Sequence, residues 1–446
     1  MRKNRVEQLP FMLNPIETPQ SRELKQISKI LYRNPMVCDL VLRDLLPSEI
    51  KSSKGANGMS AEQVLRASIV KQMYGYSYKN LAFHLLDSIA LRKFCHIGIF
   101  DKGFKKSALC DNIKCISPKT WESINRILAH DAEQEGIEKG REIRVDCTAV
   151  ESDIHPPTDS TLLWDCVRVL TRLMNKAFED GNKISFQNHT RRSKRRMIAI
   201  ENSNSSKHRK KQYRDLIKVT KKVTKDAKNA IEYLKKYGFS LAALAISEEL
   251  ARYVELTQKV LNQTYRRVFK NETVPASEKI FSIFEEHTDI IIKDRRNKFY
   301  GHKICLTGGK SNLIIDCQIT EGNPADSTLA SIMVERQNEI YDRYPLKAAF
   351  DGGFASKANL ADIKLKGVKD VCFAKKRGLK VENMCRSEWV YKRLRNFRAG
   401  IESGISWLKR SFGLTRCTWK GFESFKSYVW ASIVSANLLT MARAQL

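Results

Sequence analysis

Short stretches of strand periodicity are separated by long stretches of helical periodicity, and this alternation limits the possible folds most strongly. From Glu142 to Val150 apolar residues recur at every second position, which is typical of a strand with one buried face. Further short strands are predicted at residues 279–284, 302–307, 313–320, 347–350 and 370–374. This pattern predicts an α/β fold in which helices cover a mixed sheet.

The helical stretches on either side of the first strand predict two further parts of the chain. Residues 60–130 indicate short helices, and Ser60 and Gln63 have the spacing of a capping box. These helices are compatible with a DNA-reading helix-turn-helix and equally with a packing module that touches no bases. We expect a helical N-terminal domain over 1–138, a sheet domain over 139–151 plus 276–446, and a basic helical insertion over 152–275.

The charge of the chain indicates the kind of partner. It has 79 Lys and Arg against 49 Asp and Glu, a formal net charge of +30. Residues 183–228 alone hold 16 basic and 3 acidic side chains. An isolated basic run is usually a solvated helical face, but here the rest of the chain is basic too. We therefore expect a polyanionic partner, with nucleic acid as the first choice.

Other features of the sequence indicate an intracellular protein. Eleven cysteines, an odd number without a pairing pattern, are typical of reduced thiols. The spacing of Cys110 and Cys115 does not suit a zinc site. The N-terminus lacks the apolar core of a signal peptide, and no uncharged apolar run reaches 18 residues. No membrane association is expected.

Three acidic residues occupy positions where carboxylates need an explanation. Asp146 interrupts a strand of Ile, Val, Cys and Thr, where an unpaired carboxylate is costly unless it is exposed. Asp351 ends the strand 347–350, although an Asp before Gly-Gly is often only a turn former. Glu402 shares one helix face with Arg398 and Lys409, although such a face can be a simple exposed ion pair. The three acids together favour a catalytic site.

The order of these acids resembles that of the DDE transposases of bacterial insertion sequences. Their Y-(2)-R-(3)-E-(6)-K signature aligns with Arg398, Glu402 and Lys409 at the family's spacing, while Arg395 fills the Tyr position and Tyr391 lies nearby. The resemblance extends over most of residues 60–446 and includes these segments: Val145-Asp-Cys-Thr148, Pro157-Thr-Asp-Ser160, Tyr300-Gly-His302, Gly322-Asn-Pro-Ala-Asp326 and Phe350-Asp-Gly-Gly353.

The resemblance implies an RNase H-like fold and a mechanism. Asp146, Asp351 and Glu402 would be the catalytic acids and would bind Mg²⁺ or Mn²⁺, two ions in all. The enzyme would bind the terminal inverted repeats of its element, hydrolyse the DNA at its ends and join the 3′-hydroxyls to target DNA. It would act as a homodimer that pairs two ends, in the bacterial cytoplasm at the nucleoid.

The DNA contacts expected from the sequence come from two places. The resemblance implies that Arg398 and Lys409, with Arg395 beside them, hold the terminal nucleotides. The basic segment adds five more cationic side chains, Arg191, Arg192, Lys194, Arg195 and Arg196. Two alternatives use the same residues: an RNase H-like nuclease without strand transfer, and a DNA-binding protein derived from a transposase but catalytically idle.

Overall fold

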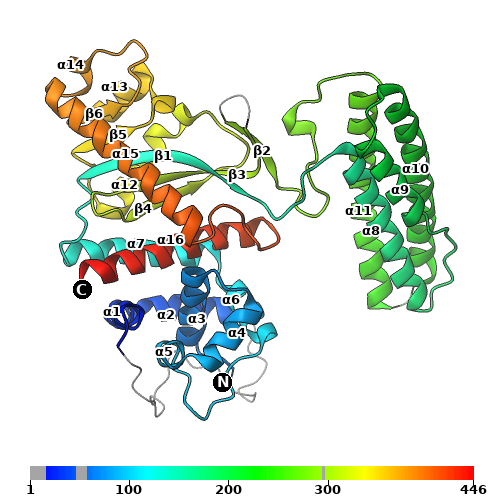
Figure 1. Cartoon of the computed structure of the whole chain (residues 1–446), viewed down its shortest axis with the longest axis horizontal. Coiled ribbons are helices and arrows are strands. Elements are labelled where there is room, and N and C mark those ends of the chain that lie inside the picture. Colours follow the sequence, from blue (N-terminus) through cyan, green and yellow to red (C-terminus); the bar gives the residue numbers. More distant parts are fainter. Residues whose placement is uncertain (1–16, 47–57, 239, 294–296) are drawn as a thin grey trace. The chain divides into compact units, whose positions relative to one another are not determined.

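The computed structural model describes residues 17–46, 58–238, 240–293 and 297–446. The chain forms two compact units (Figure 1). The first combines Met1–Glu151 with His302–Leu446, and the second is Ser152–Gly301. The three-domain division predicted from the sequence is not tested by this grouping and stays a prediction.

A mixed sheet of six strands lies at the centre of the α/β part of the chain. The strands are β1 (Glu142–Glu151), β2 (Asp289–Lys293), β3 (Asn297–Gly308), β4 (Ile314–Ile319), β5 (Lys347–Phe350) and β6 (Asp370–Phe373). Their order is β2-β3-β1-β5-β6, with β4 also paired to β3. β1, β5 and β6 run parallel, whereas β2 and β4 are antiparallel to β3. This open mixed sheet flanked by helices is the predicted RNase H-like arrangement.

Successive side chains of β1 point to opposite faces of the sheet, and different helices cover these two faces. Ile143 and Val145 are buried in a core shared with helix α12 (Ala330–Tyr341). Arg144 and Asp146 point to the opposite face, which is covered by α15 (Glu388–Ser411). The polar face of the strand therefore lies under the helix that carries the third predicted acid.

The first unit contains further helices, and several of them pack against the last helix of the sequence. They are α1 (Pro19–Arg33), α2 (Met36–Leu45), α3 (Ala61–Tyr74), α4 (Tyr78–Asp87), α5 (Ile89–Phe94), α6 (Lys106–Cys115), α7 (Pro118–Gln134), α13 (Lys357–Leu365), α14 (Val381–Met384) and α16 (Phe422–Ala444). The capping box between Ser60 and Gln63 is confirmed. α16 is buried along most of its length and packs against α7, α3 and α1, so the helical N-terminal region is built partly from the C-terminus.

The second unit is a bundle of long helices, as the helical periodicity predicted. It contains α8 (Asp159–Glu179), α9 (Thr190–Glu201), α10 (Ser206–Tyr237) and α11 (Leu241–Val268), which lie side by side in Figure 1. Leu170, Val223 and Leu250 are fully buried in its core. The basic segment identified in the sequence forms α9 and most of α10.

The strand predicted at 279–284 is wrong. The side-chain amide of Gln263 in α11 donates a hydrogen bond to the Ile280 carbonyl and accepts one from the Ile280 N–H. The hydroxyl of Ser282 accepts hydrogen bonds from the N–H groups of residues 284 and 285. Phe281 and Ile283 are buried. Side-chain hydrogen bonds here replace those of a ladder, and the strand forms later, at Asp289–Lys293.

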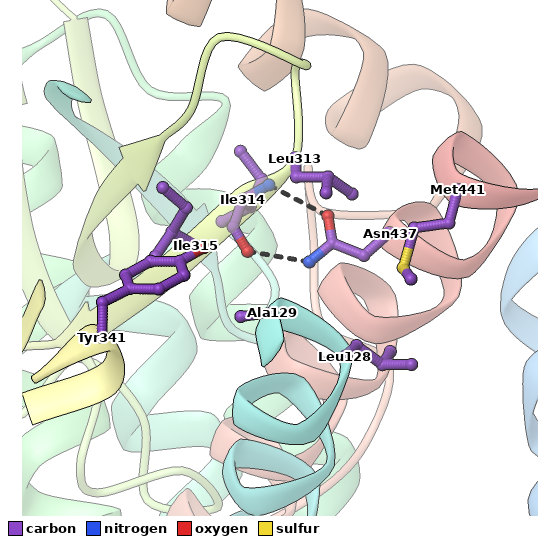
Figure 2. A pocket seen from close by; sticks show the side chains of 8 residues that line it. All are labelled: Leu128, Ala129, Leu313, Ile314, Ile315, Tyr341, Asn437 and Met441. Atoms are coloured by element: carbon purple, nitrogen blue, oxygen red, sulfur yellow. Dashed lines mark hydrogen bonds between the residues drawn. The ribbon is translucent and has the colours of Figure 1, made fainter. Parts of the chain in front are cut away.

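Two buried asparagines satisfy the outer edge of β4. Asn437 of α16 accepts a hydrogen bond from the Ile314 N–H at 2.9 Å and donates to the Ile314 carbonyl at 2.7 Å (Figure 2). Its amide also donates to Asn125 of α7, which in turn donates to the Ile315 carbonyl. At the first two residues of β4, side chains therefore take the place of a neighbouring strand.

None of the described helices combines the length and the apolar character that crossing a lipid bilayer requires. All eleven cysteines carry free thiols; Cys115 is exposed, Cys110 is half-buried and the others are buried.

We predict that Asn437→Leu lowers the free energy of unfolding by about 2–4 kcal/mol, because both backbone groups of Ile314 lose their partner in a buried site. Denaturant unfolding of the full chain measures the change. Thr440→Val is the control, because the Thr440 hydroxyl bonds only its own helix, at Ala436. Equal stability of the two variants would contradict the prediction.

Candidate active site

One long helix carries the third acid and the basic residues around it. α15 begins at Glu388, with Ser387 as its N-cap, and it contains Arg395, Arg398, Glu402 and Lys409. Ile401 and Leu408 are buried on the side that faces the sheet. The spacing of Arg395, Arg398, Glu402 and Lys409 places these four side chains along one neighbouring face.

Arg144 of β1 anchors this helix to the sheet. Its guanidinium donates to the Phe397 carbonyl at 3.0 Å and to Asn312 at 2.5 Å, and it lies 4.8 Å from the centre of the Phe397 ring. Burial lowers the pKa of this guanidinium. A Cβ at Gly400 would collide with the guanidinium, so a larger residue there would displace Arg144 from its hydrogen bonds.

The two aspartates are neighbours because of strand register. β1 and β5 are parallel, and Val145 is paired with Phe350. Asp146 and Asp351 each follow one member of that pair, so they lie side by side on adjacent strands where β5 ends. Residues 205 positions apart in the chain therefore meet at one edge of the sheet.

All three predicted acids contact a single guanidinium, that of Arg398. Its Nη2 lies 2.9 Å from Glu402 Oε1, and its Nη1 lies 3.3 Å from Asp351 Oδ1 and 3.9 Å from Asp146 Oδ2. Asp146 Oδ1 also accepts a hydrogen bond from the Cys147 N–H at 2.7 Å. The structure thus brings Asp146, Asp351 and Glu402 together around one cation.

Two of the three carboxylates are accessible, whereas the third and the shared guanidinium are largely buried. The side chains of Asp351 and Glu402 are 43% and 58% exposed, but those of Asp146 and Arg398 are only 18% and 14% exposed. Carboxylate oxygens are the ligands that hard divalent cations such as Mg²⁺ or Mn²⁺ prefer. In the part of the chain that the structure describes, however, no three acidic, His or Cys side chains, these three acids included, are placed so that they could hold one ion together.

Two glycines after Asp351 let neighbouring side chains close around the site. A Cβ at Gly352 would lie 2.7 Å from the Cβ of Lys375, and one at Gly353 would lie 2.6 Å from Asp326 Oδ2. Asp326 is itself held by Lys303, whose ammonium lies 2.9 Å from its Oδ1. The two glycines are therefore needed not only for the turn but also for the close approach of the Lys375 and Asp326 side chains.

Sequence reasoning missed the positioning role of Arg144 and left Asp326 and Lys375 unassigned. The alternation along β1 puts Arg144 on the same face as Asp146, and this was the available signal. Nothing in the sequence could show that Asp326 and Lys375 lie against the glycines that follow Asp351.

The predicted DNA contacts lie in both units. On α15, Arg395 is exposed and Lys409 is half-buried. On α9, Arg192 and Arg196 both bind Asp215, and hydrogen bonding from Arg192 lowers the pKa of this carboxyl. Arg191, Lys194 and Arg195 are exposed on the same helix.

An RNase H-like sheet with these acids at its edge defines a class of enzymes that act on nucleic-acid phosphodiesters. Residues 286–438 match the family model described as a transposase DDE domain, and residues 16–115 match the model described as a transposase domain (DUF772). The chain belongs to the DDE transposases of insertion sequences. The first match includes Asp351 and Glu402, whereas Asp146 precedes it. No curated protein and no solved structure matches the chain. The more detailed signature that includes Arg398 and Lys409 stays a prediction.

We predict that Gly400→Ala destabilises the protein by about 1–3 kcal/mol, because the new methyl group displaces a guanidinium that is hydrogen-bonded on both sides. Gly404→Ala in the same helix is the matched control, since a Cβ there meets nothing within 4 Å. The control should be neutral or stabilising by up to about 1 kcal/mol. Denaturant unfolding compares the two, and equal stabilities would contradict the close approach of α15 to β1.

Proposed function

We propose that this transposase cleaves the DNA at the ends of its element and joins the released 3′-hydroxyls to target DNA at the site formed by Asp146, Asp351 and Glu402. The observation that carries the proposal is the meeting of these three acids at Arg398. Carboxylates that lie close together repel one another, so three of them around one guanidinium would be stabilised further by a bound cation.

The three carboxylates are the residues that would hold Mg²⁺ or Mn²⁺, in the proposed case two ions. Such a pair, when bound, stabilises both the attacking and the leaving oxygen of an in-line displacement at phosphorus. The chain's own contribution is to fix the acids. Strand register sets Asp146 beside Asp351, and Arg144 fixes the helix that presents Glu402.

The basic residues of α15 would place the DNA strand against these acids. Arg395 and Lys409 flank Arg398 and Glu402 on the same helix face, so a phosphate backbone lying along this face would meet cations on both sides of the acidic cluster. Water as the attacking group gives end cleavage, and a DNA 3′-hydroxyl in its place gives strand transfer. No covalent bond to the protein is required in either step.

The partners in this proposal are two terminal inverted repeats and a target duplex. Pairing of two ends requires two active sites, so we propose a homodimer on DNA, in the bacterial cytoplasm at the nucleoid. Reading the sequences that flank the gene tests this part directly. Inverted repeats on both sides support it, whereas their absence favours the nuclease without strand transfer.

We predict that Asp146→Asn, Asp351→Asn and Glu402→Gln each reduce end cleavage by at least about 10³-fold, a loss of ~4 kcal/mol of transition-state stabilisation. Binding of end DNA should stay within about threefold of wild type. Glu388→Gln is the control, because Glu388 is an exposed acid at the start of the same helix. Cleavage and joining are scored separately on labelled duplexes that carry the flanking repeat.

Full cleavage by Glu402→Gln would show that another residue is the third acid. Cleavage without any joined product, under conditions where two ends are paired, would favour the nuclease alternative over the transposase reaction.

We also predict that Arg398 competes with the divalent cations. Arg398→Gln should bind Mn²⁺ on the order of tenfold more tightly than wild type, about 1.4 kcal/mol, because a bound ion no longer shares the carboxylates with a guanidinium. The rise in melting temperature with Mn²⁺ concentration measures this affinity, and the measurement does not depend on enzymatic activity. Asp351→Asn should lose most of the shift. A weaker response of Arg398→Gln would mean that the guanidinium supports metal binding rather than opposing it.

A further inference from the structure

A continuous line of positive charge runs along α10 in the second unit. Its members recur at alternating intervals of four and three residues, which places them on one face of a helix. All are exposed, and we call them the α10 stripe: Lys207, Lys211, Arg214, Lys218, Lys221, Lys225 and Lys228. At 1.5 Å per residue the stripe is about 31 Å long.

The stripe lies on the side of α10 that faces away from the bundle core. Leu216 and Val223 are fully buried, and each precedes a stripe member, Lys218 or Lys225, by two positions. Two residues correspond to about 200° around a helix of 3.6 residues per turn. The packed face and the stripe are therefore on opposite sides of the helix, and apart from Arg214 the stripe members point away from the bundle core.

The charge of the stripe is not compensated within the unit. In the described ranges none of its members forms an ion pair with a carboxylate; Arg214 lies over the Phe269 ring, 5.6 Å from its centre. The contrast with α9 is direct, because Arg192 and Arg196 share the carboxylate of Asp215. Like charges at these spacings cost roughly 0.2–0.5 kcal/mol per neighbouring pair. The stability of the bundle therefore gives no reason for the six lysines of the stripe.

We propose that the α10 stripe is a binding surface for the phosphate backbone of duplex DNA, and this proposal rests on the proposed function of the chain. Six of its seven members are lysines, which act as point charges towards phosphate rather than as readers of base edges. Its length is close to one turn of B-form DNA, about 34 Å. We therefore expect this contact to be independent of the DNA base sequence. It would hold the DNA but take no part in cleavage or joining.

The test compares two triple variants of the full-length protein that lose equal charge in the same unit. The stripe variant is Lys218→Gln, Lys221→Gln and Lys225→Gln. The control is Lys176→Gln, Lys183→Gln and Lys270→Gln, which removes exposed lysines of the same unit that lie outside α10. The probe is a duplex of about 30 base pairs of arbitrary sequence, with affinity measured over a range of salt concentrations.

The stripe variant should bind at least about tenfold more weakly, and the slope of log K against log[salt] should fall by about 2.7, since each phosphate contact contributes about 0.9. The control should change the slope by less than about one. Equal slopes in the two variants would overturn the proposal, because charge alone would then explain the affinity. A duplex RNA that binds the wild type more tightly than the DNA would overturn it as well.

The result is separable from that of the catalytic proposal. Asp351→Asn should keep the wild-type salt slope while losing cleavage. The stripe variant, saturated with end DNA at low salt, should still cleave at a rate within about threefold of wild type. Loss of cleavage at saturation would show that the stripe positions DNA for the reaction itself and would contradict a purely holding role.

Discussion

The acidic site depends on the contacts that one guanidinium makes with three carboxylates from three different elements. Asp146 comes from β1, Asp351 from the end of β5 and Glu402 from α15, and without a cation between them their mutual repulsion would oppose the packing of α15 on the sheet. Arg398 lies only four residues before Glu402. The same helix therefore supplies both the third acid and the positive charge that offsets the repulsion between the acids. Arg144 then fixes the distance of this helix from β1.

Much of this could be predicted from local sequence. The β5 strand at 347–350 was predicted correctly because a short apolar run ends at Asp-Gly-Gly, and the capping box at Ser60 because its two partners are three residues apart. The face shared by Arg398, Glu402 and Lys409 follows from helical spacing alone. Each of these signals lies within a few residues of the feature that it predicts.

The features that the sequence did not predict depend on contacts between segments that are far apart in the chain. The strand predicted at 279–284 has suitable apolar residues, but Gln263 of α11 takes its backbone hydrogen bonds. The packing of Asp326 and Lys375 against Gly353 and Gly352 joins three loops and has no local signature. The meeting of the three acids itself was expected from the family resemblance rather than from periodicity, because neither strand register nor helix placement can be read from spacing across hundreds of residues.

In the sequence, the helical bundle comes after β1 and before all the other strands, and this order matters while the ribosome synthesises the chain. β1 leaves the ribosome roughly 200 residues before its parallel partner β5, so at 5–20 residues per second it waits about 10–40 s for that partner. During this interval the bundle, whose helices pack mainly on one another, can fold first. The first strand meanwhile has no parallel partner, and the polar Arg144 and Asp146 on one of its faces make it less prone to pair with other chains.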